Sequence, residues 1–231
     1  MSSNLGDGQN YGLAPELTPA AQSATQAKTV FGQVMFLVAL TCGFAAAGAY
    51  IGRDLGFGQA MIFWLGALGL MLGMSFVRKA QNGPLALGLL FALGLLLGLA
   101  IGPTISNYAS LENGSSIIWQ SAGLTALFIA AFGAYGYATR RDLSGMARGL
   151  FWALLALIGF GIVTIFVQIP GGRIIYSVLG LVIFAGYTMY DFNRLRRARE
   201  EQAAMIAVSI FLDVFNVFLL ILNLMGGGGR N

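Results

Sequence analysis

Two aspartates stand apart from the other carboxylates of this chain. Of nine acidic residues, seven fall in polar stretches of the sequence, where solvation explains them. Asp213 instead lies about ten residues inside an apolar run, and Asp191 closes the apolar run before it. A charge at such depth in hydrocarbon costs several kcal/mol unless it is paired, hydrated or neutralised. The two aspartates are therefore the first candidates for a functional site.

The spacing of the two aspartates predicts that they lie at one depth. The midpoint between residues 191 and 213 falls in the polar stretch 200–202. If the chain reverses there between two helices, each aspartate lies about 11 residues, or roughly 16 Å, from the turn. Two carboxyl groups close together in a poorly hydrated site tend to share one proton, so the pair can respond to pH. In its ionised form the pair offers hard oxygen ligands that suit transient binding of Ca²⁺.

Further polar side chains lie on the same helix faces as the two aspartates. They recur at helical spacing before Asp191 and on both sides of Asp213, with Asn223 continuing the line. We use the name polar seam for Tyr187, Thr188, Asp191, Ser209, Asp213 and Asn216. The pattern has two interpretations: a functional acid pair with supporting groups, or a hydrogen-bonded helix contact whose acids stay neutral.

The composition places these residues in a membrane. The chain of 231 residues is 57% hydrophobic and only 10% charged, whereas soluble domains carry about 25% charged residues. Because there is no His, a Ser/His relay and a His-ligated zinc site are excluded, and the single Cys42 cannot form a disulfide or a cysteine metal cage. We expect no enzyme and no tightly bound cofactor, although a multispan protease with two aspartates stays open. Nucleic acid is not an expected partner, because the basic residues sit in short gaps between apolar runs.

Seven apolar runs are long enough to cross the hydrocarbon core of about 30 Å as helices. None shows the alternation of a barrel strand, so we expect an all-α integral membrane protein with seven transmembrane helices. The expected spans are Val30–Ile51, Phe57–Val77, Pro84–Ile101, Ile117–Ala138, Gly149–Ile169, Ile174–Tyr190 and Ala203–Met225. They form one domain over residues 30–225, between a disordered polar tail (1–29) and a short Gly-rich tail (226–231).

The basic residues predict the orientation of the chain. Ten of the 13 Lys and Arg residues fall in the N-terminal tail and in the second, fourth and sixth loops. Since cytoplasmic loops carry the excess of positive charge, the N-terminus is expected in the cytoplasm and the C-terminus on the other side.

Glycines recur at every fourth position in two of the predicted spans. Gly94, Gly98 and Gly102 form such a row in the third span, and Gly69 and Gly73 repeat the spacing in the second. Rows of this kind let helix backbones approach closely in lipid. We expect a packing contact within the chain, with a dimer interface as the alternative.

Four stretches, in order along the chain, resemble the Bax inhibitor family, also called the transmembrane Bax inhibitor motif family, in its bacterial form. They are Gly102–Tyr108, Tyr137–Ser144, Gly186–Asn193 and Ile210–Phe218. The resemblance extends over about residues 30 to 225 and is most specific in the C-terminal half. It implies a seven-helix fold with a central C-terminal helix, in a bacterial inner membrane.

The resemblance also implies a function, that of a pH-sensitive calcium leak channel. The aspartates that match Asp191 and Asp213 form the proton-sensing gate between the sixth and seventh helices. A basic residue at the cytoplasmic end of the second helix acts as a latch on this pair. Arg78 is the best match to the latch, and Lys79 is the reserve. The implied partners are the lipid bilayer, calcium and protons.

One departure and one alternative accompany the resemblance. Some relatives carry an acid midway along the second helix, but no Asp or Glu occurs here between Gly56 and Val77, so a further ion site is not expected there. The features around Pro103 also resemble the bacterial branch of the family that modulates a membrane-anchored protease. The alternative function is therefore that of a regulatory membrane protein that binds such a protease or another membrane complex.

Overall fold

The computed structural model describes residues 19–80 and 83–227, with the side chains of residues 28–74 and 84–226. In these ranges the chain forms seven long helices, two short 3₁₀ helices and no strand. The long helices are α1 (Pro19–Ile51), α2 (Phe57–Ala80), α3 (Gly83–Ala109), α4 (Gly114–Ala138), α5 (Met146–Phe166), α6 (Gly172–Leu195) and α7 (Ala203–Gly227). Each is long and apolar enough to cross a membrane. The predicted all-α integral membrane fold with seven transmembrane helices is confirmed.

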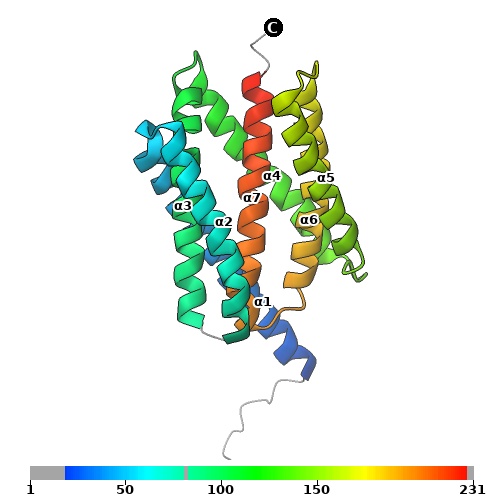
Figure 1. Cartoon of the computed structure of the whole chain (residues 1–231). Helices are drawn as coiled ribbons and strands as arrows, with labels where there is room; N and C mark the ends of the chain where they lie inside the picture. Colours follow the sequence, from blue (N-terminus) through cyan, green and yellow to red (C-terminus); the bar gives the residue numbers. More distant parts are fainter. Residues whose placement is uncertain (1–18, 81–82, 228–231) are drawn as a thin grey trace, which may run out of the picture.

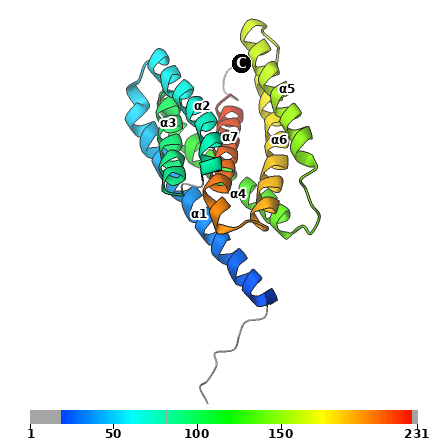
Figure 2. The ribbon, with the colours of Figure 1, turned by 60° about the horizontal axis from the view of Figure 1, so that its bottom comes forward.

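Helix α7 occupies the centre of the bundle. Figure 1 shows it in red, with α2 and α3 on one side and α5 and α6 on the other. It packs against α1, α3, α4 and α6, and Figure 2 shows the same arrangement from another side. Its largest fully buried side chains are Phe211, Ile206, Ile210, Leu222 and Val217. A helix that is apolar around most of its circumference is stable only when other helices surround it or lipid does, and here the other helices do.

The glycine row of α3 packs against α1 within the chain. A Cβ atom added to Gly94 would lie 2.7 Å from the carbonyl oxygen of Thr41, and one added to Gly98 would overlap the backbone of Ala45. Contact of this closeness is possible only because glycine has no side chain. The glycines of α2 make no such close contact within the described residues: no atom lies within 4 Å of a Cβ added to Gly69 or Gly73.

The first helix begins earlier than the sequence predicts. A disordered tail was expected over residues 1–29, but α1 starts at Pro19, so residues 19–29 are helical. Ala and Gln are good helix formers, and a transmembrane span provides a helix nucleus that such residues can extend. Residues 1–18 lie outside the described part of the chain. At the other end α7 continues to Gly227, and the remainder of the expected Gly-rich tail also lies outside it.

The third helix ends later than predicted, and the fifth ends earlier. Helix α3 continues through Pro103 to Ala109, two turns beyond the expected end at Ile101. Neighbouring helices can satisfy the backbone groups that a proline frees, so a transmembrane helix tolerates it. The stretch around Pro103 is therefore part of a helix and not a loop. Helix α5 ends at Phe166, before the expected Ile169.

The outer surface of the bundle is apolar. Side chains such as Ile62, Leu127 and Phe166 are exposed by 68%, 66% and 82%. Exposed apolar patches of this extent are rare on soluble monomers. The surface is that of a protein surrounded by lipid.

Candidate functional site

The structure places Asp191 and Asp213 together between α6 and α7. The two helices form a hairpin through the 3₁₀ helix η2 (Glu200–Gln202), which lies where the sequence predicts the turn. Each aspartate is only 4% exposed. The carboxyl group of Asp213 lies close enough to that of Asp191 for the two to interact electrostatically.

The polar atoms next to Asp213 have unused bonding capacity. Thr188 on α6 is fully buried, and its side chain lies beside the Asp213 carboxyl group. The Thr188 Oγ1 and the Asp213 Oδ2 nevertheless lack hydrogen-bond geometry with each other and with any other group in the described part of the chain. Buried polar atoms are nearly always partnered in native proteins, so exceptions need an explanation. An orphaned carboxylate oxygen in a buried site is a place where a proton or a cation can bind.

The other members of the polar seam divide into two groups. Tyr187 on α6 is half-buried and interacts electrostatically with both aspartates. Ser209 and Asn216 instead bond to their own helix: the Ser209 hydroxyl donates to the Met205 carbonyl at 3.4 Å, and the Asn216 amide donates to the Leu212 carbonyl at 2.7 Å. Helix residues with short polar side chains commonly make such bonds. Among the described residues, Ser209 and Asn216 therefore make no hydrogen bond to the aspartates across the helix interface.

The predicted latch can be placed only by its backbone. Arg78 and Lys79 lie in the last turn of α2, and their side chains fall outside the described residues. The structure identifies another basic residue beside the site, because Arg194 interacts electrostatically with Asp191. The sequence interpretation missed Arg194, although its spacing of three from Asp191 on one helix was the available signal.

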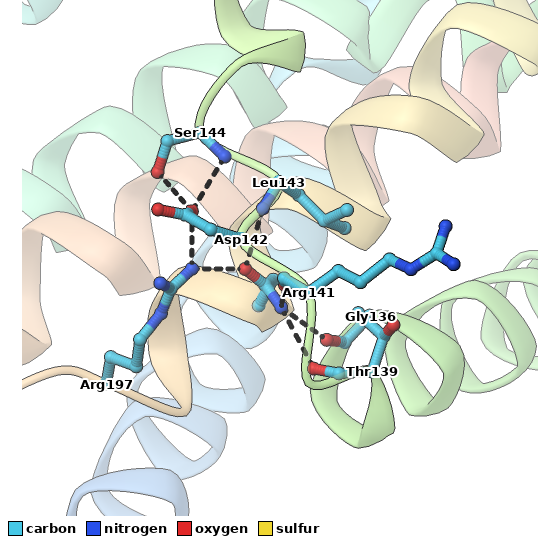
Figure 3. A network of polar contacts seen from close by, with 8 residues as sticks. Gly136, Thr139, Arg141, Asp142, Leu143, Ser144 and Arg197 are labelled. Atoms are coloured by element: carbon cyan, nitrogen blue, oxygen red, sulfur yellow. Dashed lines mark hydrogen bonds and ion pairs between the residues drawn. The ribbon is translucent and has the colours of Figure 1, made fainter.

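Asn193 joins the end of α6 to the end of α4, two residues after Asp191. It is only 1% exposed, and both the nitrogen and the oxygen of its amide make hydrogen bonds. The Nδ2 donates to three backbone carbonyls, those of Gly136 (3.2 Å), Thr139 (3.3 Å) and Arg141 (3.1 Å). Figure 3 shows the carbonyls of Gly136 and Thr139 that accept two of these bonds. The Asn193 Oδ1 accepts from the Leu143 N–H at 3.3 Å and from the Arg197 guanidinium. Asn193 therefore fixes the α4–α5 loop against the hairpin that carries the aspartates.

An ion pair at the surface also holds the α4–α5 loop against the end of α6. Arg197 donates to Asp142 at 2.8 Å, and Ser144 donates to the same carboxylate through its N–H at 2.9 Å and its hydroxyl at 2.6 Å. The Arg197 guanidinium and Ser144 hold the pKa of the Asp142 carboxyl well below its usual range. From the sequence we expect Asp142 to be a solvated loop residue and nothing more. An Asp two residues before a Ser is, however, typical of an Asx-turn, in which the Asp side chain accepts a hydrogen bond from the backbone two residues later.

The acid pair does not extend into a larger metal cluster. The described residues contain no group of three or more His, Cys, Asp or Glu side chains that could hold a metal ion. Tight Ca²⁺ sites use six to eight oxygen ligands, so two carboxylates suit transient binding.

The comparison with known proteins identifies the family of this chain. The family model described as "Inhibitor of apoptosis-promoting Bax1" matches residues 27–230, which include all seven helices from Lys28 onward. The chain belongs to the Bax inhibitor family.

Several bacterial proteins match this chain over nearly its whole length. An uncharacterized membrane protein of Vibrio cholerae is 26% identical over 211 residues, which cover 90% of this chain and 94% of that protein. An uncharacterized protein of Pseudomonas aeruginosa is 27% identical over 217 residues (93% and 96%). The inner membrane protein YbhL of Escherichia coli K12 is 27% identical over 222 residues (90% and 94%). Together with the seven apolar helices, these relatives show an integral protein of a bacterial inner membrane.

Proposed function

We propose that this Bax inhibitor family member is a pH-sensitive calcium leak channel gated by Asp191 and Asp213. The observation that supports the proposal best is the burial of the two carboxyl groups together between α6 and α7, with one oxygen of Asp213 unbonded within the described residues. Protons and Ca²⁺ would compete for these oxygens, since both need the same carboxylate lone pairs. In this proposal calcium is the transported ion, no cofactor is tightly bound, and no reaction is catalysed.

The gate would work through the charge of the pair. When at least one carboxyl is ionised, a charge-assisted bond to a basic residue on α2 holds that helix over the mouth of the pathway. The basic residue keeps its proton if it is Arg78, because a guanidinium does not titrate, so only the acids can switch the contact. Full protonation removes the anion and frees α2, and it also removes the ligands of the cation. Flux would therefore depend on pH through two opposing effects and can peak at an intermediate pH.

Calcium flux into liposomes tests this proposal directly. The full-length protein is reconstituted in vesicles that contain a calcium dye, and flux is measured over a range of pH. Asp213→Asn should abolish most of the pH response, because it removes the shared proton site without changing the shape of the side chain. Glu112→Gln is the matched control, since Glu112 is exposed in the α3–α4 loop. If Asp213→Asn behaves like the intact protein, or the intact protein passes no calcium at any pH, the channel proposal is rejected.

A further inference from the structure

A cavity lies on the face of α7 opposite to the aspartates. Its volume is about 690 Å³, within the range of about 300–1,000 Å³ that is typical of ligand sites. Helix α7 contributes four side chains with the spacing of a single helix face, Phe211, Val214, Phe215 and Phe218. Asp213 points to the other side, where it meets α6. The central helix therefore separates a polar site from an apolar one.

The cavity opens between α1 and α4. Helix α1 packs on α3 and α7, and α4 packs on α6, α7 and, less extensively, α3, but α1 and α4 make no extensive contact with each other. Ala46 on α1 and Ala126 on α4 line the cavity and are exposed. Because both rim residues are small, the cavity faces the lipid through a lateral entrance.

The lining is apolar along its length and charged at one end. Among the described residues that line the cavity, Arg53 alone is charged. It lies just after α1, with its guanidinium 4.6 Å from the centre of the Tyr50 ring and its Nε 3.2 Å from the Asp54 carboxylate. Half of its side chain is exposed. A cation where a transmembrane helix ends is at the depth of the lipid headgroups.

The length of the cavity matches one leaflet of a bilayer. The lining residues of α1 and of the 3₁₀ helix that follows it run from Cys42 to Arg53, which corresponds to about 16 Å of helix. Half of the hydrocarbon core is about 15 Å thick. An apolar slot of this depth, open to lipid and with an arginine at its interfacial end, fits one chain of a phospholipid in length, and its positive charge is complementary to the phosphate above that chain. Arginine suits the phosphate because its guanidinium can donate two parallel hydrogen bonds.

We propose that this cavity binds one acyl chain of a membrane phospholipid whose phosphate contacts Arg53. The lipid enters sideways between α1 and α4 and packs against the phenylalanine face of α7. This site does not involve the acid pair, so a test of lipid binding does not depend on the proposed channel function.

Photo-crosslinking of the intact protein tests the position of the lipid. The full-length protein is placed in nanodiscs of phosphatidylethanolamine and phosphatidylglycerol that contain phosphatidylglycerol with a diazirine in its acyl chain. After illumination, peptide mapping should find the crosslinks concentrated on the cavity-lining parts of α1, α3, α4 and α7. Crosslinks spread evenly over the outer faces of α2 and α5 would overturn the proposal, as would a second copy of the chain captured at the α1–α4 opening.

Two variants test the acyl-chain and phosphate contacts separately. Ala49→Trp places an indole in the cavity, and native mass spectrometry of the extracted protein should show a several-fold loss of retained phospholipid. Ala47→Trp is the matched control, since Ala47 is exposed on the same helix and does not line the cavity. Arg53→Gln should lower retention through loss of the phosphate contact. If Ala49→Trp fails to fold, Arg53→Gln and the crosslinks of the intact protein still test whether the cavity binds a phospholipid. Unchanged retention in both variants would overturn the proposal.

Discussion

Asp191 and Asp213 occupy one buried environment, so a change at either residue alters the other. We expect Asp191→Asn and Asp213→Asn each to remove most of the pH response of calcium flux, and the double variant to do little more. The reason is that a shared proton is lost when either partner is lost. A double-mutant cycle on the flux-against-pH profile measures the coupling. Independent effects that add in the double variant would contradict a shared proton.

Asp142, like the control residue Glu112, should not contribute to the pH response of calcium flux. Arg197 and Ser144 hold its pKa well below the usual range. A carboxyl whose pKa is lower in the folded state than in the unfolded state stabilises the fold. This stabilisation is complete above the unfolded-state pKa of about 4, and it is lost only as the pH falls through the lower pKa of the folded state. Its contribution is therefore constant between about pH 5 and 8.

The Asp142→Asn variant tests this separation of roles. We expect it to leave the shape of the flux-against-pH profile unchanged and to lower the thermal unfolding temperature by the same small amount at about pH 5 and 8. Differential scanning fluorimetry at the two pH values, beside the flux assay, provides the measurement. A changed flux profile would show that the α4–α5 loop takes part in gating.

At the scale of elements, α2 is the part of the molecule that the gate would move. If Arg78 is the latch, Arg78→Ala should leave α2 away from the mouth at alkaline pH, although the acids are still ionised. Spin-label distances between α2 and α7 would report this as an alkaline state that resembles the acidic one. A variant that still closes normally at alkaline pH would show that Arg78 only sets the topology. Lys79→Ala serves as the neighbouring comparison.

Asn193 holds α4, the α4–α5 loop and α6 together through one side chain. We expect Asn193→Ala to destabilise the fold by about 2 kcal/mol or more, because it leaves several partly buried backbone groups without a partner. Asn216→Ala is the matched control, since the amide of Asn216 bonds only to its own helix among the described residues. Thermal unfolding in one detergent compares the two. An equal, small effect of both changes would contradict the role of Asn193 as a clamp.

At the scale of the whole molecule, the distribution of charge predicts the orientation in the membrane. In a background of Cys42→Ala, a cysteine at Arg141 should react with an impermeant thiol reagent only from the cytoplasmic side. A cysteine at Ser110, in the α3–α4 loop, should react only from the opposite side. The physical reason is that basic loops are retained in the cytoplasm during insertion. Labelling of intact cells and of inverted vesicles distinguishes the two sides, and the reverse pattern would overturn the orientation.

The sequence by itself determined the seven helices and placed Asp191 and Asp213 at one depth. Both follow from constraints that act along one chain: the thickness of the hydrocarbon sets the length of a span, and the constant helical rise places two residues equidistant from a turn at one depth. The bond of Asp142 to Ser144 was also accessible, because it is local.

The tertiary structure alone decided which neighbours each helix face meets. Periodicity placed Ser209 and Asn216 on the face of Asp213, but it could not show that their bonds close on their own helix. Nor could it show that Asn193 reaches three carbonyls more than 50 positions earlier in the chain, or that α1 and α4 leave a cavity between them. These features depend on how far apart two helices pack. That distance is set by side chains from remote parts of the sequence acting together. In addition, the sequence does not distinguish apolar residues that face lipid from those that face another helix, because lipid and the protein interior are equally apolar.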